Sequence, residues 1–317
     1  MTVNVVFTGP QDAIDWLGEE LGNRYSVTHV AADAEKIARA LEGAEVLLDA
    51  SMKIAITAPM IDTAESLKLV ITATTGADHI DAAALQSRGI PLKTLRGETA
   101  FLRDITPAAE LTWLLLMACA RRLRAAVRHV ENGEWDREQF PGRMLRGRTV
   151  GVVGCGRVGT WVSRYARAFD MRVIGYDPLV TDLAETIERA PLNEVFSEAD
   201  FVVLTVTFAP ETAGLIGAAE LGRMKEGAAL INTSRGAIVR EEDLLDGLIS
   251  GRPAFLGVDV LEGEPDIRES PIWQYASDHD NVIITPHIGG FSRDALEQVL
   301  RHTAKRIIVF FEGDQAK

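Results

Sequence analysis

The sequence has 317 residues, which is enough for two domains of ordinary size, each able to bury its own core. Hydrophobic residues make up 47% of the chain and charged residues 25%, a balance that excludes an intrinsically disordered or fibrous protein. The net charge of −13 repels nucleic-acid phosphates and anionic lipid surfaces, so we expect neither nucleic acid nor a membrane as partner.

The two cysteines and the apolar segments bear on the compartment. Cys119 and Cys155 lack CxxC or Cys/His spacing, which favours a reducing environment and predicts no metal site and no disulfide. The first ten residues, MTVNVVFTGP, lack the basic and long apolar regions of a signal peptide. The strongest apolar run, 111–120, is too short to cross a membrane. We therefore expect a cytoplasmic protein.

In the first third of the chain, short apolar segments rich in β-branched residues alternate with stretches compatible with helices. The predicted strands cover residues 3–7, 25–30, 44–50 and 67–73. This alternation is typical of parallel βαβ units.

A second α/β block follows a predicted helix that begins at Thr106-Pro107, with Thr106 as N-cap, and continues to about Val130. Its predicted strands cover 149–154, 172–176, 201–206, 228–232, 254–260 and 281–286. A last helix, 292–311, follows Gly289-Gly290 and can return to the first block. The fold class predicted is α/β with two doubly wound parallel-sheet domains, a discontinuous one of residues 1–98 and 292–317 and an inserted one of residues 99–291.

A glycine-rich segment follows the strand that begins at Thr149. It has the GxGxxG pattern between a strand and a helix, the context in which backbone amides hold a pyrophosphate, and its candidate nucleotide-binding residues are Gly154, Gly156, Arg157, Val158 and Gly159. The next strand ends at Asp177, about 20 residues further on, where an acid accepts from the adenosine ribose hydroxyls. An acid there repels a 2′-phosphate, so the pattern predicts NAD rather than NADP.

Three later segments fall at the carboxyl ends of predicted strands, where open α/β sheets bind ligands. These segments are 231–236, 259–265 and 285–290. Arg235 has the planar fork that holds a carboxylate through two hydrogen bonds. His287 can give or take a proton near neutral pH, and Glu264 can hold its ring and favour the imidazolium. We name Arg235, Glu264 and His287 as candidate catalytic residues for a 2-keto or 2-hydroxy acid.

With these motifs in this order, the chain resembles the D-isomer-specific 2-hydroxyacid dehydrogenase family, which includes glycerate, glyoxylate/hydroxypyruvate and phosphoglycerate dehydrogenases. The resemblance implies a flavodoxin-like substrate domain interrupted by a Rossmann domain, with NAD and substrate in the cleft between them, and a homodimer. It implies that the amides of Gly76 and Ala77 bind the substrate carboxylate and that Asp259 receives the nicotinamide carboxamide. Further NAD-binding residues expected on this basis are Thr205, Thr233, Ser234, His287 and Gly289.

Three segments depart from the family's pattern and leave the substrate open. They are Thr205–Pro210 after the third Rossmann strand, Leu95–Thr99 before the crossover, and Ala50–Lys53, where a phosphoglycerate-type Arg-Ser pair is replaced. The roles of Lys53 and Arg96 stay undefined. His79 is interpreted as a structural or loop residue, because the resemblance gives a catalytic place only to His287.

The sequence therefore predicts an NAD-dependent oxidoreductase that interconverts a D-2-hydroxy acid and its 2-keto acid by hydride transfer, with His287 as acid and base. One alternative is a non-enzymatic, corepressor-like protein that senses NAD, against which the presence of Arg235, Glu264 and His287 argues. The other is a formate- or phosphite-type dehydrogenase, against which Glu264 argues.

Overall fold

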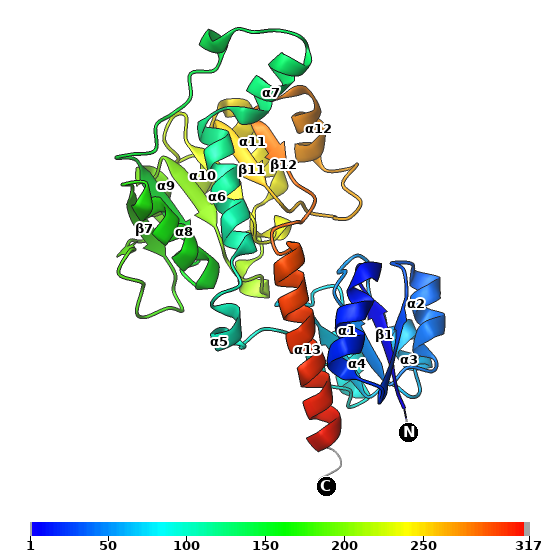
Figure 1. The fold of residues 1–317 in the computed structure, drawn as a ribbon. Coiled ribbons are helices and arrows are strands. Elements are labelled where there is room, and N and C mark those ends of the chain that lie inside the picture. The colour runs from blue at the N-terminus through cyan, green and yellow to red at the C-terminus, as the bar shows by residue number, and fades with distance from the viewer. Residues whose placement is uncertain (1, 314–317) are drawn as a thin grey trace. The chain divides into compact units, whose positions relative to one another are not determined.

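The computed structural model describes residues 2–313 and divides the chain into two compact units. The first unit combines Met1–Ile105 with Arg293–Lys317, and the second is Thr106–Ser292. The short helix α5 (Thr99–Leu102) therefore belongs to the first unit, although the sequence analysis placed it at the start of the inserted domain. Each unit is an α/β body built on one parallel sheet, which confirms the predicted fold class (Figure 1).

The sheet of the first unit has the strand order β2-β1-β3-β4-β5, and all its neighbours pair in parallel. This is the order of flavodoxin-like sheets. Its strands are β1 (Val3–Thr8), β2 (Tyr25–His29), β3 (Val46–Asp49), β4 (Leu69–Thr72) and β5 (Leu92–Lys93). The two-residue β5 at the edge was not predicted from the sequence.

Helices cover both faces of this sheet, because alternate side chains of each strand point to opposite sides. Phe7 and Leu48 lie in one buried cluster with α1 (Ile14–Leu21) and α13 (Arg293–Gly313), which lie side by side in Figure 1. Val6 and Leu47 lie in the opposite cluster, with helices α2 (Ala34–Leu41), α3 (Ala58–Thr63) and α4 (Ala82–Ser87). The C-terminal helix thus completes the first unit's core.

The sheet of the second unit has the order β12-β11-β10-β9-β6-β7-β8, again parallel throughout. Its strands are β6 (Thr149–Val153), β7 (Arg172–Tyr176), β8 (Glu188–Arg189), β9 (Phe201–Leu204), β10 (Ala229–Asn232), β11 (Phe255–Val258) and β12 (Val282–Ile284). The order reverses between β6 and β9, and doubly wound sheets bind ligands at the carboxyl ends of the strands at such a point.

Both faces of the second sheet are buried too. One cluster joins Val152 and Val203 to α6 (Pro107–Ala120) and α8 (Arg157–Ala168). The other joins Leu204 and Leu230 to helices α9 (Leu192–Glu198), α10 (Ala218–Leu221), α11 (Glu241–Ser250) and α12 (Pro271–Asp278). Continuous burial of the central strands explains why their sequences are apolar without alternation.

The long helix expected from Thr106 to about Val130 is in fact two helices, so that prediction was wrong in part. Helix α6 ends at Ala120, and α7 covers Leu123–Glu131. Between them Arg122 has φ +51°, a left-handed conformation that no α-helix contains. Pro107 does begin α6, but the hydroxyl of Thr106 bonds Glu110 and caps no amide.

Candidate active site

The glycine-rich loop after β6 is a backbone cradle that side chains would fill. Gly154 has φ +91°, and a Cβ there would lie 2.7 Å from the carbonyl carbon of Thr205. A Cβ on Gly159 would lie 2.3 Å from the carbonyl oxygen of Gly154. Both positions therefore require glycine, the first for the turn and the second for close packing of α8 against β6.

The amino end of α8 closes this loop. Gly156 is its N-cap, and a Cβ built on Gly156 meets nothing within 4 Å, so the space beside this residue is open. Arg157 begins the helix, and burial lowers the pKa of its guanidinium. Val158 packs against the buried cluster beneath. An open helix N-terminus with a glycine cap suits the pyrophosphate of a dinucleotide.

Asp177 lies at the end of β7, beside the glycine-rich loop. Its Oδ2 accepts from the Cys155 amide at 2.9 Å, and its Oδ1 accepts from the amides of Leu179 and Val180 at 2.8 and 3.1 Å. A carboxylate oxygen can accept more than one hydrogen bond, so the ribose hydroxyls of NAD still find acceptors here. The same side chain thus shapes the loop and offers the acidic group expected for NAD.

Three hydroxyl groups that the sequence pointed to for NAD binding brace the loops of the site. Thr205 donates to the carbonyl of Gly154 at 2.5 Å, and Ser234 donates to the carbonyl of Leu204 at 2.7 Å. The hydroxyl of Thr233 lies 2.6 Å from that of Thr112 on α6. Their side chains thus tie the segments after β6, β9 and β10 to one another and to α6.

Asp259 is almost fully buried just after β11, where it organises the segment that carries His287. Its Oδ1 accepts from the hydroxyl of Thr285 at 2.6 Å and from the amide of Ile288 at 2.9 Å, and its Oδ2 accepts from the amide of Gly289 at 2.7 Å. Burial raises the pKa of Asp259, although these hydrogen bonds oppose the rise. Gly289 fits because a larger residue would crowd this carboxylate, which lies 3.0 Å from the Cβ position.

His287 and Glu264 form the predicted pair. The distance from His287 Nδ1 to Glu264 Oε1 is 2.7 Å, and about a third of each side chain is exposed. His287 has φ +53°, a conformation held by its amide, which donates to the carbonyls of Asp259 and Thr285. Because Glu264 occupies Nδ1, Nε2 is the ring nitrogen that can exchange a proton with a ligand.

Arg235 follows β10 on a loop fixed by Asn232. The side-chain Nδ2 of Asn232 donates to the carbonyl of Arg235 at 2.9 Å, and its Oδ1 accepts from the backbone amide of Ser234 at 3.0 Å. The next residue, Gly236, packs so closely that a Cβ there would lie 2.2 Å from the backbone carbon of Leu261. The Arg235 loop therefore rests directly on the segment that leads to Glu264.

In the first unit, Gly76 and Ala77 lie in the loop after β4. The hydroxyl of Thr74 donates to the carbonyl of Gly76 at 2.6 Å, and the Ile80 amide donates to the carbonyl of Ala77 at 3.0 Å. Within residues 2–313, the amides of Gly76 and Ala77 themselves donate to no protein acceptor. Two unused adjacent amides fit the carboxylate-binding role that the family resemblance implies.

Asn232 and Thr112 support the site but were not predicted from the sequence. Asn232 is buried at the end of β10, and a polar side chain closing an apolar strand was the available signal. Thr112 gave no such signal, because its role depends on how α6 packs against β10.

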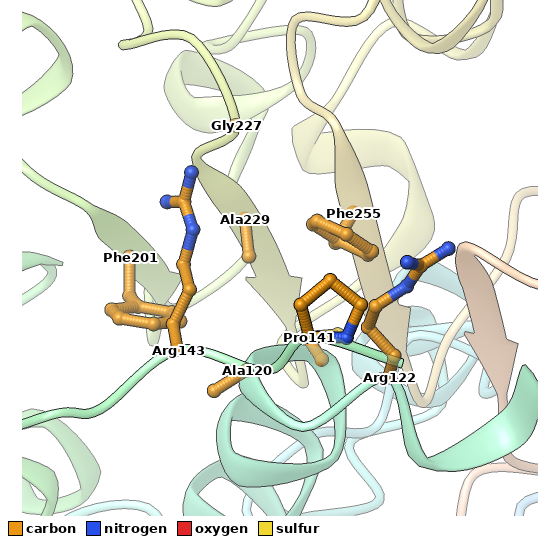
Figure 2. Close-up of a pocket in the computed structure, with 9 residues that line it drawn as sticks. Ala120, Arg122, Pro141, Arg143, Phe201, Gly227, Ala229 and Phe255 are labelled. Carbon is orange, nitrogen blue, oxygen red and sulfur yellow. The ribbon is translucent and has the colours of Figure 1, made fainter. Parts of the chain in front are cut away.

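A cavity of about 210 Å³ lies at the amino ends of three strands of the second sheet. There β9, β10 and β11 begin with Phe201, Ala229 and Phe255. Figure 2 shows the guanidinium groups of Arg122 and Arg143 on separate sides of it. Because the sheet is parallel, the segments with Arg235 and Glu264 follow the opposite ends of β10 and β11, and the glycine-rich loop and His287 follow the same ends of β6 and β12. The cavity is thus distinct from the candidate active site.

The part of the chain that the structure describes also bears on membrane and metal sites. No described helix combines the length and the apolar character that crossing a bilayer requires. No group of three or more His, Cys, Asp or Glu side chains in that part is arranged to hold a metal ion.

The comparisons with known proteins agree with this geometry. Residues 113–289 match the family described as D-isomer specific 2-hydroxyacid dehydrogenase, NAD binding domain. This description confirms the prediction of an NAD-binding domain, and the cradle of Gly154, Gly156 and Gly159 with Asp177 beside it fits that nucleotide.

Two curated relatives and one solved structure illustrate the similarity. The chain is 34% identical to the D-3-phosphoglycerate dehydrogenase of Methanocaldococcus jannaschii, with 99% of this chain but only 59% of that protein aligned. It is 34% identical to the hydroxypyruvate reductase of Thermotoga maritima over 77% of this chain and 78% of that protein. A D-lactate dehydrogenase from Aquifex aeolicus, solved with NAD and lactic acid, superposes with a TM-score of 0.85 at 28% identity and covers 99% of this chain and 97% of its own.

The family description matches more than half of the chain, and the similarity extends over both units. The motifs that carry the resemblance, from the glycine-rich loop to the His287–Glu264 pair, lie at the carboxyl ends of the second unit's strands. The chain therefore belongs to the D-isomer-specific 2-hydroxyacid dehydrogenase family.

Proposed function

We propose that the protein is an NAD-dependent oxidoreductase that interconverts a D-2-hydroxy acid and its 2-keto acid. The observation that carries this proposal is the 2.7 Å pair of His287 Nδ1 and Glu264 Oε1, formed in the same unit as the nucleotide cradle. A held imidazole whose Nε2 is available can move the proton that the reaction needs. The identity of the substrate, the catalytic roles of the residues and the partners are part of the same proposal.

The chain's own groups would divide the work of keto-acid reduction. Bound NADH supplies the hydride that the keto carbon receives. His287 in its imidazolium form gives a proton from Nε2 to the keto oxygen, and Glu264 orients the ring and stabilises its positive charge. Arg235 holds the substrate carboxylate through its planar fork. For oxidation the neutral His287 takes the hydroxyl proton.

Backbone amides and carboxylates of the candidate residues would hold the two ligands. Backbone amides at Gly156 and Arg157 would meet the pyrophosphate, and Asp177 would accept from the adenosine ribose. Asp259 would receive the nicotinamide carboxamide, close to the backbone of Gly289. In the first unit, the unused amides of Gly76 and Ala77 would bind the substrate carboxylate. Thr205, Thr233 and Ser234 would complete the nucleotide contacts.

A substrate screen tests the proposal directly. Purified protein with NADH would be given glyoxylate, hydroxypyruvate, pyruvate, longer 2-keto acids and phosphohydroxypyruvate, and oxidation of NADH would be followed at 340 nm. Turnover of a 2-keto acid supports the proposal. Binding of NADH without any turnover would favour an NAD-sensing protein, and reduction of NAD by formate or phosphite would favour that class of dehydrogenase.

Within this screen, phosphohydroxypyruvate is expected not to be the best substrate. The segment that follows β3, Ala50–Lys53, lacks the Arg-Ser pair of the phosphoglycerate type, and the adjacent Asp49 is a buried acid that disfavours a second anion. Lys53 and Arg96 are exposed and could compensate. A kcat/KM for phosphohydroxypyruvate about tenfold or more above that for hydroxypyruvate and glyoxylate would show that other cations bind the phosphate.

Cofactor choice gives a second expected result: NADH should be preferred to NADPH, and Asp177→Ser should weaken this preference. The substitution removes the ribose acceptor and the charge that repels a 2′-phosphate, and it also frees the Cys155 amide. The KM values for both nucleotides measure the change. Glu188→Ser, an exposed acid on β8, serves as control and should leave both KM values near those of the wild type. Equal or better use of NADPH by the wild type would refute this assignment.

The assembly and the compartment are also proposals. Helix α7 exposes Leu123, Val127 and Val130 on one side, and Trp135 after it is 90% exposed. A homodimer that covers these apolar side chains fits the family resemblance. Light scattering after size-exclusion chromatography would measure the mass, and a monomer at micromolar concentration would contradict it. A cytoplasmic location is proposed from the two buried cysteines, which form no disulfide.

A further inference from the structure

Asp49 is a buried acid that the proposed chemistry does not use. It is the last residue of β3, at the carboxyl edge of the first unit's sheet, and its side chain is 3% exposed. A charge in such a position is costly unless hydrogen bonds compensate it. Burial raises the pKa of Asp49, but hydrogen bonds from His79 and Thr8 outweigh this and leave the pKa below its ordinary value. The carboxylate is therefore ionised at neutral pH.

The hydrogen bonds to this carboxylate come from three parts of the first unit. At the end of β1, the hydroxyl of Thr8 donates to Oδ1. In the segment after β3, Ser51 donates to Oδ1 through its hydroxyl at 2.9 Å and its amide at 3.2 Å, and the amide of Met52 donates to Oδ2 at 3.2 Å. In the loop after β4, His79 Nε2 lies 2.9 Å from Oδ2. One side chain thus ties together the loops that follow β3 and β4.

His79 connects Asp49 to the loop that contains the unused amides of Gly76 and Ala77. Its carbonyl accepts from the amide of Ile56 at 2.8 Å, and the adjacent Ile80 donates to the carbonyl of Ala77. The amides of Gly76 and Ala77 precede His79 by only three and two residues. Their direction in space therefore depends on where the imidazole is held.

The buried position of the His79 ring is unfavourable for folding. Its side chain is 11% exposed, and Nδ1 is buried with no hydrogen-bond partner within residues 2–313. A buried polar atom without a partner opposes folding, so stability alone does not explain this histidine. Placement of the loop does explain it, because two amides bind a carboxylate tightly only when both already point at it.

We propose that Asp49 and His79 are positioning residues for the substrate: their buried pair holds the Gly76–Ala77 loop in the conformation in which its two amides bind the substrate carboxylate. This inference rests on the proposed function. Neither residue contacts the reacting atoms, so the pair acts on binding of the keto acid and leaves the chemical step and NADH binding unchanged.

Two substitutions of His79 and one matched control test the pair. His79→Leu removes the hydrogen bond to Asp49, whereas His79→Gln keeps an N–H donor near the place of Nε2 and lacks the unpartnered nitrogen. The control is His29→Leu, since His29 is a half-buried histidine on β2 of the same sheet whose Nε2 bonds the carbonyl of Gly9 at 2.9 Å. Steady-state kinetics with the best keto acid and NADH give KM for both substrates and kcat.

His79→Leu should raise KM for the keto acid about tenfold or more, with kcat and KM for NADH within about threefold of the wild type. His79→Gln should restore KM for the keto acid to within about threefold, and His29→Leu should leave it unchanged. Amide hydrogen exchange provides a readout without turnover: exchange in the peptides around 50–53 and 74–81 should become faster in His79→Leu and not in His29→Leu.

Unchanged amide exchange in His79→Leu would refute the claim that the Asp49–His79 pair holds the Gly76–Ala77 loop in place. Faster exchange with an unchanged KM, or an equal rise of KM in His29→Leu, would overturn the role in substrate binding. If His79→Leu does not fold, Asp49→Asn takes its place, because the amide oxygen still accepts from Thr8 and Ser51. A wild type that reduces no keto acid refutes the proposed function, and the exchange comparison still decides whether the pair holds the loop.

Discussion

Replacing His287 with alanine is expected to lower kcat for keto-acid reduction about 10²- to 10⁴-fold, the usual worth of a general acid. The loss should fall mainly on kcat, because the imidazole would give its proton only as the reaction proceeds. KM for NADH should change little, since Asp259, which orders the amides of Ile288 and Gly289, keeps its hydrogen bonds. Steady-state kinetics across a pH series measure both effects.

The matched control is His279→Ala. His279 is a more exposed histidine of the same unit, stacked on Tyr275 and bonded to its carbonyl, and it has no place in the proposed chemistry. Glu264→Gln should fall between the two, because an amide still orients the ring of His287 but no longer stabilises its positive charge. If His287→Ala kept a near-wild-type kcat and pH profile, the catalytic assignment would be wrong.

The second large effect is expected from Arg235→Lys, which should lower kcat/KM for the keto acid about 10²-fold. Lysine keeps the charge but loses the planar fork, so the substrate is held by one point contact and can lie about 1 Å out of place. KM for the keto acid should rise and kcat should fall together, whereas KM for NADH should stay near its wild-type value. Kinetics with both substrates varied separate these parameters.

Arg240→Lys is the control for this substitution. Arg240 precedes α11, a few residues along the chain, and its side chain is two-thirds exposed beside Asp243. It should show wild-type kinetics. An Arg235→Lys enzyme that kept its KM for the keto acid would show that another group anchors the carboxylate.

Much of the fold could be predicted from the sequence, because its signals are local. Apolar β-branched segments at regular intervals gave the long strands of both sheets, and parallel pairing followed from the helices between them. The edge strands β5 and β8 have two residues each and leave no periodicity to recognise. The break at Arg122 was missed because its left-handed backbone occurs in a residue type with no preference for it.

The candidate site shows a similar division. The His287–Glu264 pair was predicted from the position and chemistry of the two residues, since both follow parallel strands whose carboxyl ends share one edge of the sheet. The bracing hydroxyls of Thr205 and Ser234 depend on packing between strands, which no sequence pattern records. His79 was interpreted as a structural or loop residue, but its buried partner Asp49, thirty positions earlier, left no signal in the sequence.

The close approach of Gly236 to Leu261 and Glu262 limits how the candidate active site can evolve. Because no side-chain atom separates the two backbones, a shift of the loop that carries Arg235 displaces the segment that carries Glu264, and with it the ring of His287. The proposed carboxylate anchor and the proposed proton donor are therefore mechanically coupled. Under the proposed function, new substrate preferences should arise more readily in the loops of the first unit, which carry none of these residues.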